Sequence, residues 1–266
     1  MASSSDGSAR FDGHIYPQSV PEPDEIAEGG PAPWAHLAIE RRRSLSLETV
    51  IDRLERSNRN LSTSEVPGDP AEMTAIADLR GEPIMRRSAV LAALFEEDGD
   101  VNVVLTRRSF ELRFHRGEIA LPGGASDPGE TPLHTALRET REEVGIAESQ
   151  VHPTAWLSPI VTFASGSVIW PFVGTLRQRP SMVIDPHEVD RAFTVSLSEL
   201  LSDGAFLEER WRRQVSRPGS DSDGYFPMYF FRVPDDLIWG ATARVLTELL
   251  CIVTDVQWPD ANRVWA

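Results

Sequence analysis

Cysteine is almost absent from this chain, because Cys251 is the only one among 266 residues. A lone cysteine cannot form a disulfide within the chain, which suits a reducing compartment, and we expect the protein to be cytoplasmic. The sequence also has no uninterrupted apolar run of about 18 residues, and no basic segment followed by an apolar one at its start. We therefore expect neither a signal peptide nor a membrane-spanning helix.

Positive charge is scarce too. The chain has 26 Lys and Arg against 41 Asp and Glu, a formal net charge of −15. Nucleic acid and anionic membranes attract clustered cations, so we expect no nucleic-acid partner and no membrane partner. What is present, 41% hydrophobic and 25% charged residues, is typical of a globular protein of one or two domains with a substantial core.

Composition divides the chain into four segments. Residues 1–33 are rich in Ser, Gly, Pro, Asp and Glu, which predicts a disordered tail. Residues 34–84 begin with apolar residues at helical spacing, with Ser46 as a candidate N-cap, and predict a helical extension. The main domain is expected over 85–255, followed by a C-terminal tail over 256–266.

The pattern of apolar residues locates the elements of the main domain. Runs over 89–95 and 101–106, joined by an acidic turn that contains glycine, predict a β-hairpin. Further strands are expected over 151–156, 168–176 and 225–233, and a closing helix over about 237–253. The polar loop over 185–190 contains Glu188, a candidate metal-binding carboxylate or general base, for which a plain turn residue is an equally good interpretation.

A helix with carboxylates on one side is expected between Thr131, a good N-cap, and Gly145, a good helix end. Pro132 suits its first position. The 3.6-residue period puts an apolar face and an acidic face on nearly opposite sides. The apolar face comprises Leu133, Leu137, Thr140 and Val144, and the acidic face comprises Glu139, Glu142 and Glu143.

The acidic face is a candidate metal site. Glu139 and Glu143 are a like-charged i,i+4 pair, which is unfavourable without a counter-charge. Arg138 can neutralise Glu142, which leaves a two-carboxylate oxygen site of the kind that Mg²⁺ prefers. The carbonyl of Gly124, in the paired glycine before the helix, can complete the oxygen shell. A solvated acidic face is the alternative.

A cationic stretch precedes this helix. Within ten residues the chain has Arg107, Arg108, Arg113, His115 and Arg116. Guanidinium groups bind phosphate oxygens bidentately, so this stretch suits a substrate with several phosphates. The alternative is that the arginines pair with the surplus of carboxylates. A histidine taken alone is more often structural than functional.

Two motifs resemble a known family. The spacing Gly124, five residues, Glu130, seven residues, Arg138-Glu139, two residues, Glu142-Glu143, one residue, Gly145-Ile146 resembles the Nudix box of Nudix hydrolases, which cleave a nucleoside diphosphate linked to another moiety. The upstream order Leu-Thr-Arg-Arg-Ser, Leu112, His115, Gly117-Glu118 and Pro-Gly-Gly resembles the extra motif of the coenzyme A pyrophosphatase branch. The chain departs from these patterns at Thr140, usually aliphatic, and at Leu121, usually Phe.

The resemblance implies an α/β fold, an α/β/α sandwich around a mixed β-sheet, and a hydrolase that depends on Mg²⁺ or Mn²⁺. Arg138 would orient the carboxylates and tie the loop to the helix through Glu130. Candidate catalytic residues are Arg138, Glu139, Glu142 and Glu188, and candidate metal ligands are Glu139, Glu142, Glu143 and Gly124. Candidate substrate-binding residues are Arg107, Arg108, Arg113 and His115.

The implied substrate is a small nucleotide, coenzyme A or a derivative, cleaved to 4′-phosphopantetheine and adenosine 3′,5′-bisphosphate. One alternative is a Nudix hydrolase for ADP-ribose, a dinucleotide or a nucleoside triphosphate. Another is a non-catalytic nucleotide-binding regulatory module, although the sequence retains every box carboxylate. A homodimer is left open.

Overall fold

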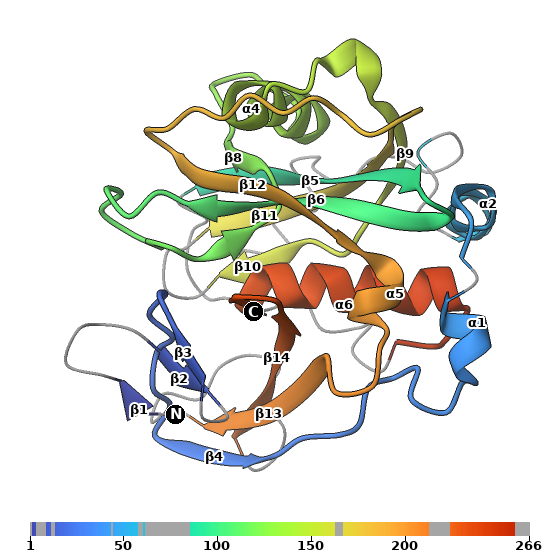
Figure 1. Ribbon diagram of the computed structural model, residues 1–266. Coiled ribbons are helices and arrows are strands. Elements are labelled where there is room, and N and C mark those ends of the chain that lie inside the picture. Colours follow the sequence, from blue (N-terminus) through green and yellow to red (C-terminus); the bar gives the residue numbers. More distant parts are fainter. Residues whose placement is uncertain are drawn as a thin grey trace.

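The protein is described by a computed structural model that covers residues 2–3, 9–11, 14–43, 45–57, 61, 86–162, 167–212 and 224–258. An eight-stranded mixed sheet forms its centre. Figure 1 shows helix α4 (Pro132–Val144) on one face of this sheet and helix α6 (Gly240–Thr254) on the other. The expected α/β sandwich around a mixed sheet is confirmed.

The central sheet runs in the order β10-β11-β5-β6-β12, and β11 and β5 are its parallel pair. These strands are β5 (Arg86–Glu97), β6 (Asp100–Arg108), β10 (Ile160–Thr162), β11 (Ser167–Thr175) and β12 (Val189–Ser196). Three short strands pair alongside them, β7 (Ile119–Ala120), β8 (Gly123–Ala125) and β9 (His152–Trp156). The hairpin expected over 89–95 and 101–106 is present as β5 and β6.

Strand β5 shows why the sheet is covered on both faces. Its residues Leu91 and Phe95 belong to the apolar cluster under α4, and Leu94 belongs to the cluster under α6. All three are fully buried. Because successive side chains of a strand point to opposite faces, a strand buried on both faces reads as one continuous apolar run.

A second sheet has the order β15-β14-β13-β4. Its strands are β4 (Glu25–Glu28), β13 (Phe206–Arg212), β14 (Tyr225–Val233) and β15 (Asp236–Trp239). The closing helix therefore begins at Gly240 and not at about 237, because residues 236–239 pair with β14. Strand β13 was not expected from the sequence.

The N-terminal segment differs from the disorder expected over residues 1–33. Strand β4 pairs with β13, and β1 (Ala2–Ser3), β2 (Ala9–Phe11) and β3 (His14–Tyr16) form a small antiparallel sheet. The side chains of β4 are mostly exposed, so backbone hydrogen bonds to β13 hold it, together with the contacts of Glu25 to Arg212 and Tyr225. An edge strand offers such bonds to any extended segment, which is why the polar composition misled the prediction.

The expected helical extension is present as α1 (Ile39–Arg43) and α2 (Leu47–Arg56), and Ser46 caps α2 as expected. Residues 62–84 of this segment lie outside the described residues. Trp34 is fully buried and stacks on Phe231, with the ring centroids 6.2 Å apart. The extension therefore packs into the same body as the main domain.

The remaining helical elements are short, namely α5 (Leu197–Leu200) and the 3-10 helix η1 (Glu148–Gln150). At the C-terminal end Trp258 is buried in the core, so the start of the expected 256–266 tail is packed. Within the described residues, no helix has the length and apolar character needed to cross a membrane.

Candidate active site

The local sequence of α4 sets its position and its ends. Thr131 caps the helix, because its side chain accepts a hydrogen bond from the backbone N–H of His134 at 3.3 Å, and Gly145 ends it at φ 75°. Thr140 is fully buried on the core side, and its hydroxyl donates to the carbonyl of Ala136 at 2.7 Å. The departure at Thr140 thus leaves no unpaired polar group in the core.

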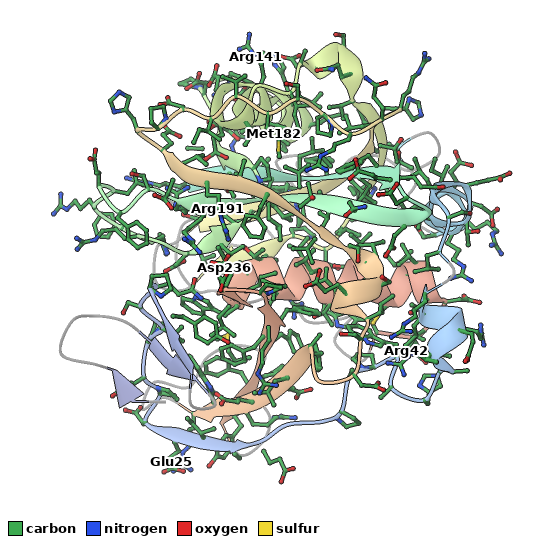
Figure 2. All side chains as sticks on the ribbon, viewed as in Figure 1. Glu25, Arg42, Arg141, Met182, Arg191 and Asp236 are labelled. Atoms are coloured by element: carbon green, nitrogen blue, oxygen red, sulfur yellow. The ribbon has the colours of Figure 1, made fainter. Side chains whose placement is uncertain are left out.

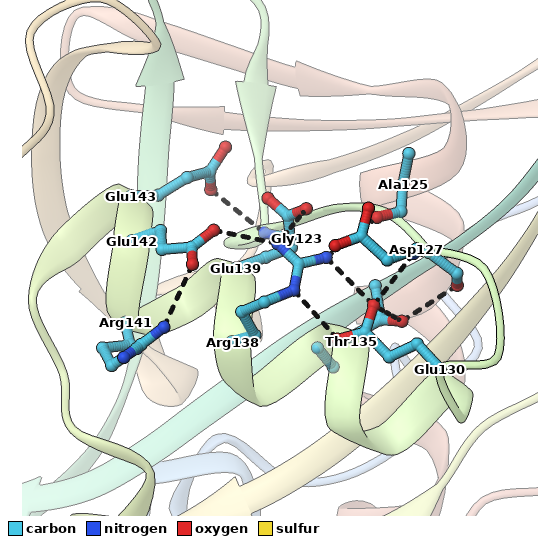
Figure 3. Close-up of polar contacts among 12 residues, drawn as sticks. Gly123, Ala125, Asp127, Glu130, Thr135, Arg138, Glu139, Arg141, Glu142 and Glu143 are labelled. Carbon is cyan, nitrogen blue, oxygen red and sulfur yellow. Dashed lines mark hydrogen bonds and ion pairs between the residues drawn. The ribbon is translucent and has the colours of Figure 1, made fainter.

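Arg138 joins the loop before α4 to the carboxylates of the helix (Figure 3). Its guanidinium contacts Glu130 through Nε at 2.9 Å and Nη2 at 3.0 Å, and Nη2 also donates to the carbonyl of Ala125 at 3.0 Å. Nη1 contacts Glu139 Oε1 at 2.9 Å and Glu142 Oε2 at 2.8 Å. The prediction that Arg138 ties the loop to the helix through Glu130 is confirmed.

Glu130 is the anchor of this loop. Its carboxylate accepts hydrogen bonds from Arg138, from the backbone of Asp127 at 3.0 Å and from the hydroxyl of Thr135 at 2.8 Å. The hydrogen bond from Arg138 is the main reason that the pKa of Glu130 is lowered to about 2. Sequence reasoning missed Thr135, whose only signal is its place one turn after the N-cap.

Two carboxylates lie against the paired glycine. Glu143 Oε2 accepts the backbone N–H of Gly123 at 3.0 Å, and its side chain is 3% exposed. A Cβ on Gly124 would lie 2.4 Å from Glu139 Oε2. Strand β8 carries both glycines and pairs with β5, which holds their backbone over α4. Glycine is needed here because any side chain at Gly124 would displace the carboxylate of Glu139.

These carboxylates resist ionisation in the absence of a cation. Burial raises the pKa of Glu143 to about 7, against the hydrogen bond from Gly123, and the neighbouring charges of Glu139 and Glu188 raise it further. Burial also raises the pKa of Glu139, and the hydrogen bond from Arg138 opposes this. Buried acids that repel each other favour a positively charged ligand between them.

Glu142 differs from its two neighbours. Its side chain is 50% exposed and is paired with Arg138 and with Arg141 Nη2, which lies 3.0 Å from Glu142 Oε1. Across the described ranges, no three His, Cys, Asp or Glu side chains gather in a way that could hold a metal ion. The candidate donor set is therefore one buried carboxylate, that of Glu143, and one partly buried carboxylate, that of Glu139, beside a glycine backbone. This suits Mg²⁺, which commonly takes one or two carboxylates together with water and substrate phosphates.

The arginines at the end of β6 point in opposite directions. Arg108 Nη1 lies 3.8 Å from Glu143 Oε1, on the side of α4. Arg107 contacts Asp236 Oδ1 through Nε at 3.1 Å and Nη2 at 2.6 Å, and Asp236 is 2% exposed. Arg191 contacts the other oxygen of Asp236, and Figure 2 shows these two side chains together. Arg107 was expected to bind substrate, with pairing to a carboxylate as the alternative, and the structure shows the pairing. Arg107 and Arg108 differ in this way because neighbouring residues of a strand face opposite sides of the sheet.

Arg113 and His115 lie on an exposed loop between β6 and β7. The guanidinium of Arg113 stacks over the ring of Phe114 at 5.2 Å. His115 Nδ1 lies 3.0 Å from Glu118 Oε2, and this hydrogen bond raises the pKa of His115. The loop reaches the site through Ser109, whose backbone N–H donates to the carbonyl of Glu188 at 2.8 Å.

This chain is similar to known proteins of one family. The family model described as "NUDIX domain" matches residues 85–217. Nudix hydrolase 3 of Caenorhabditis elegans is 31% identical over 175 residues, which are 62% of this chain and 72% of that protein. The uncharacterized Nudix hydrolase NudL of Photorhabdus laumondii subsp. laumondii is 39% identical over 148 residues, 55% of this chain and 74% of that one. A solved structure of a MutT/nudix family protein from Enterococcus faecalis is similar with a TM-score of 0.42 at 16% identity, covering 79% of this chain and 75% of that one.

Proposed function

Because this chain belongs to the Nudix family of hydrolases, which act on diphosphate linkages, we propose that it is a metal-dependent pyrophosphohydrolase of coenzyme A or its derivatives. The observation that carries the metal dependence is a pair of carboxylates, the buried Glu143 and the partly buried Glu139, against the backbone of Gly123 and Gly124. Burial raises the pKa of both acids, and a bound metal ion would favour their ionised forms.

The metal would be held by Glu139 and Glu143 with the carbonyl of Gly124, and by Glu142 through water. When bound, Mg²⁺ or Mn²⁺ neutralises charge on the diphosphate and lowers the pKa of an attacking water. Arg138 positions Glu139 by the 2.9 Å contact between their side chains. Its contacts to Glu130 fix it to the loop, so the carboxylate is oriented before substrate arrives.

Arg108 is the best-placed residue to hold a phosphate oxygen. It lies beside Glu143, and its Nε is buried without a hydrogen-bond partner among the described residues. A buried donor that lacks a partner is costly, and an anionic oxygen would satisfy it. Charge that develops on the diphosphate during cleavage would be stabilised by a guanidinium already in place.

Glu188 is our candidate for the general base. Its charge acts on both Glu139 and Glu143, so it lies near the two candidate ligands, and its side chain is exposed. The hydrogen bond from Ser109 to its carbonyl holds the loop that carries it. In this role its carboxylate would accept a proton from the attacking water.

Coenzyme A is proposed as the substrate because of the extra motif upstream of the box. Arg113 and His115 are exposed on the loop that carries this motif, beside the site, where they could bind the 3′-phosphate that distinguishes coenzyme A. The products would be 4′-phosphopantetheine and adenosine 3′,5′-bisphosphate. We also propose that the enzyme acts in the cytoplasm, for which the lone cysteine is the support.

The test is product analysis. Purified protein is incubated with Mg²⁺ or Mn²⁺ and a panel of coenzyme A, dephospho-coenzyme A, ADP-ribose, a dinucleotide and a nucleoside triphosphate, with Glu143→Gln as the control. Preferential cleavage of coenzyme A to the two expected products supports the proposal. Preference for another member of the panel would assign the protein that specificity. Binding without cleavage of any of them would instead support the regulatory module.

A further inference from the structure

Phe114 and Phe110 are exposed aromatic side chains on one loop beside the candidate active site, and Phe110, which is 42% exposed, lies against Gly117 of the same loop. Phe114 is 66% exposed, and only Arg113 lies over its ring, at 5.2 Å, among the described ring contacts. Both side chains are at the tip of the loop between β6 and β7. An exposed aromatic ring that already stacks with a guanidinium is a flat surface of the kind on which a nucleobase binds.

The loop around Phe114 has a defined conformation. The ring of Phe110 covers Gly117 so closely that a Cβ on this glycine would lie 2.5 Å from it. The backbone N–H of Gly117 donates to the carbonyl of Arg108 at 3.1 Å, and His115 is held by Glu118. His115 has φ 57°, a left-handed conformation that few residues adopt outside turns. These contacts fix the two ends of the loop together, and Phe114 is exposed at its tip.

The two ends of this loop are tied to the site. The backbone N–H of Arg108 donates across the loop to the carbonyl of Glu118 at 3.0 Å, and the side chain of Arg108 lies beside Glu143. Ser109 is hydrogen-bonded to Glu188. Figure 1 shows the loop leaving the end of β6 next to the start of β12, where Val189 pairs with Arg108. A ligand whose diphosphate lies at Glu143 would therefore have its nucleoside near this loop.

We propose that Phe114, with Arg113 stacked on its ring, binds the adenine base of the nucleotide substrate. The inference rests on the proposed function and names the part of the site that recognises the nucleoside. Two arginines, Arg113 and Arg116, are exposed on this loop, whose Glu118 is paired with His115. A nucleotide brings both a flat base and an anionic phosphate, so it matches the ring and the arginines together.

Binding without turnover tests this inference separately from the proposed function. Isothermal titration calorimetry is done in EDTA with adenosine 5′-monophosphate and with ribose 5-phosphate. Phe114→Ala is expected to weaken binding of the first by about 5- to 150-fold, the usual effect of removing an aromatic stacking partner, and to leave the second unchanged. Phe114→Trp should retain the affinity. Ile26→Ala is the matched control, since Ile26 is 44% exposed on β4 in the second sheet.

Turnover provides the second measurement. With coenzyme A, Phe114→Ala should raise KM and leave kcat unchanged, because the base is remote from the bond that breaks. Equal affinity of the wild type for the two ligands, or an affinity of Phe114→Ala within twofold of wild type, overturns the inference even if coenzyme A is cleaved. If Phe114→Ala loses the adenosine 5′-monophosphate binding that the wild type has, and the wild type cleaves no substrate, the inference is supported and only the proposed function is overturned. A wild-type dimer in sedimentation that Phe114→Ala dissociates, with nucleotide affinity unchanged, would show that the ring is a contact between copies and would also overturn it.

Discussion

Replacing Glu143 with glutamine is expected to stabilise the metal-free protein and to abolish its turnover. The carboxylate is 3% exposed and burial raises its pKa to about 7. Glutamine has nearly the same shape and keeps an oxygen that can accept the N–H of Gly123, which now donates to Glu143 at 3.0 Å. It carries no charge, so it avoids the cost of a buried anion but cannot serve as an anionic metal ligand.

The size of the effect follows from the pKa. The carboxyl of Glu143 has a pKa of about 7 in the folded protein and 4.5 as its ordinary value. For each pH unit between these two values, the free energy of unfolding of the wild type falls by about 1.4 kcal/mol. Above pH 7 the total penalty for holding Glu143 ionised in the folded protein is roughly 3 kcal/mol. Below pH 4.5 both folded and unfolded chains bind the proton and the penalty is absent. The stabilising effect of glutamine should therefore appear as the pH rises from 4.5 to 7.

Thermal denaturation in EDTA measures this directly. A gain of roughly 3 kcal/mol corresponds to a Tm increase of about 6 to 12 °C in a domain of this size, expected at pH 8 and absent at pH 4. Adding Mg²⁺ should raise the Tm of the wild type and not that of the variant. Glu142→Gln is the matched control, because this half-exposed side chain should change stability by no more than about 1 kcal/mol. A lower Tm of Glu143→Gln at pH 8 in EDTA, or turnover near the wild-type rate, would refute the reasoning.

Three further substitutions probe the supports of the site. Gly124→Ala places a Cβ 2.4 Å from Glu139 Oε2, so activity should fall by about tenfold or more. The Tm should change little, since only the flexible end of the Glu139 side chain must move. An unchanged kcat/KM would contradict this prediction. Arg138→Lys loses the two contacts to Glu130, so unfolding free energy measured in urea should fall by about 2 to 3 kcal/mol. Because the pKa of Glu130 is lowered to about 2, this difference should be full above pH 4.5 and disappear as the pH falls towards 2; a constant difference would count against it. Asp236→Ala removes the buried anion between two arginines and should cost about 3 kcal/mol or more in urea unfolding, and a neutral result would show that this ion pair is dispensable.

The sequence by itself determined the parts of the site that lie close together along the chain. The cap at Thr131, the end at Gly145 and the helix between them were readable because capping and 3.6-residue spacing act over a few residues. The same short range made the contact of Arg138 with Glu142 predictable, because residues four apart lie side by side on a helix. The hairpin of β5 and β6 was readable for a similar reason.

Only the tertiary structure decided which side chains of these local patterns meet. Arg107 and Arg108 look equivalent in the sequence, yet one pairs with Asp236, far along the chain, and the other lies at Glu143. Glu143 is buried because strand β8 lies over α4 and its Gly123 donates a hydrogen bond to the carboxylate. Strand β4 is formed because β13 has an open edge with which it can pair. These outcomes come from strand pairing and burial between distant segments, and no local pattern records which segments will pack together.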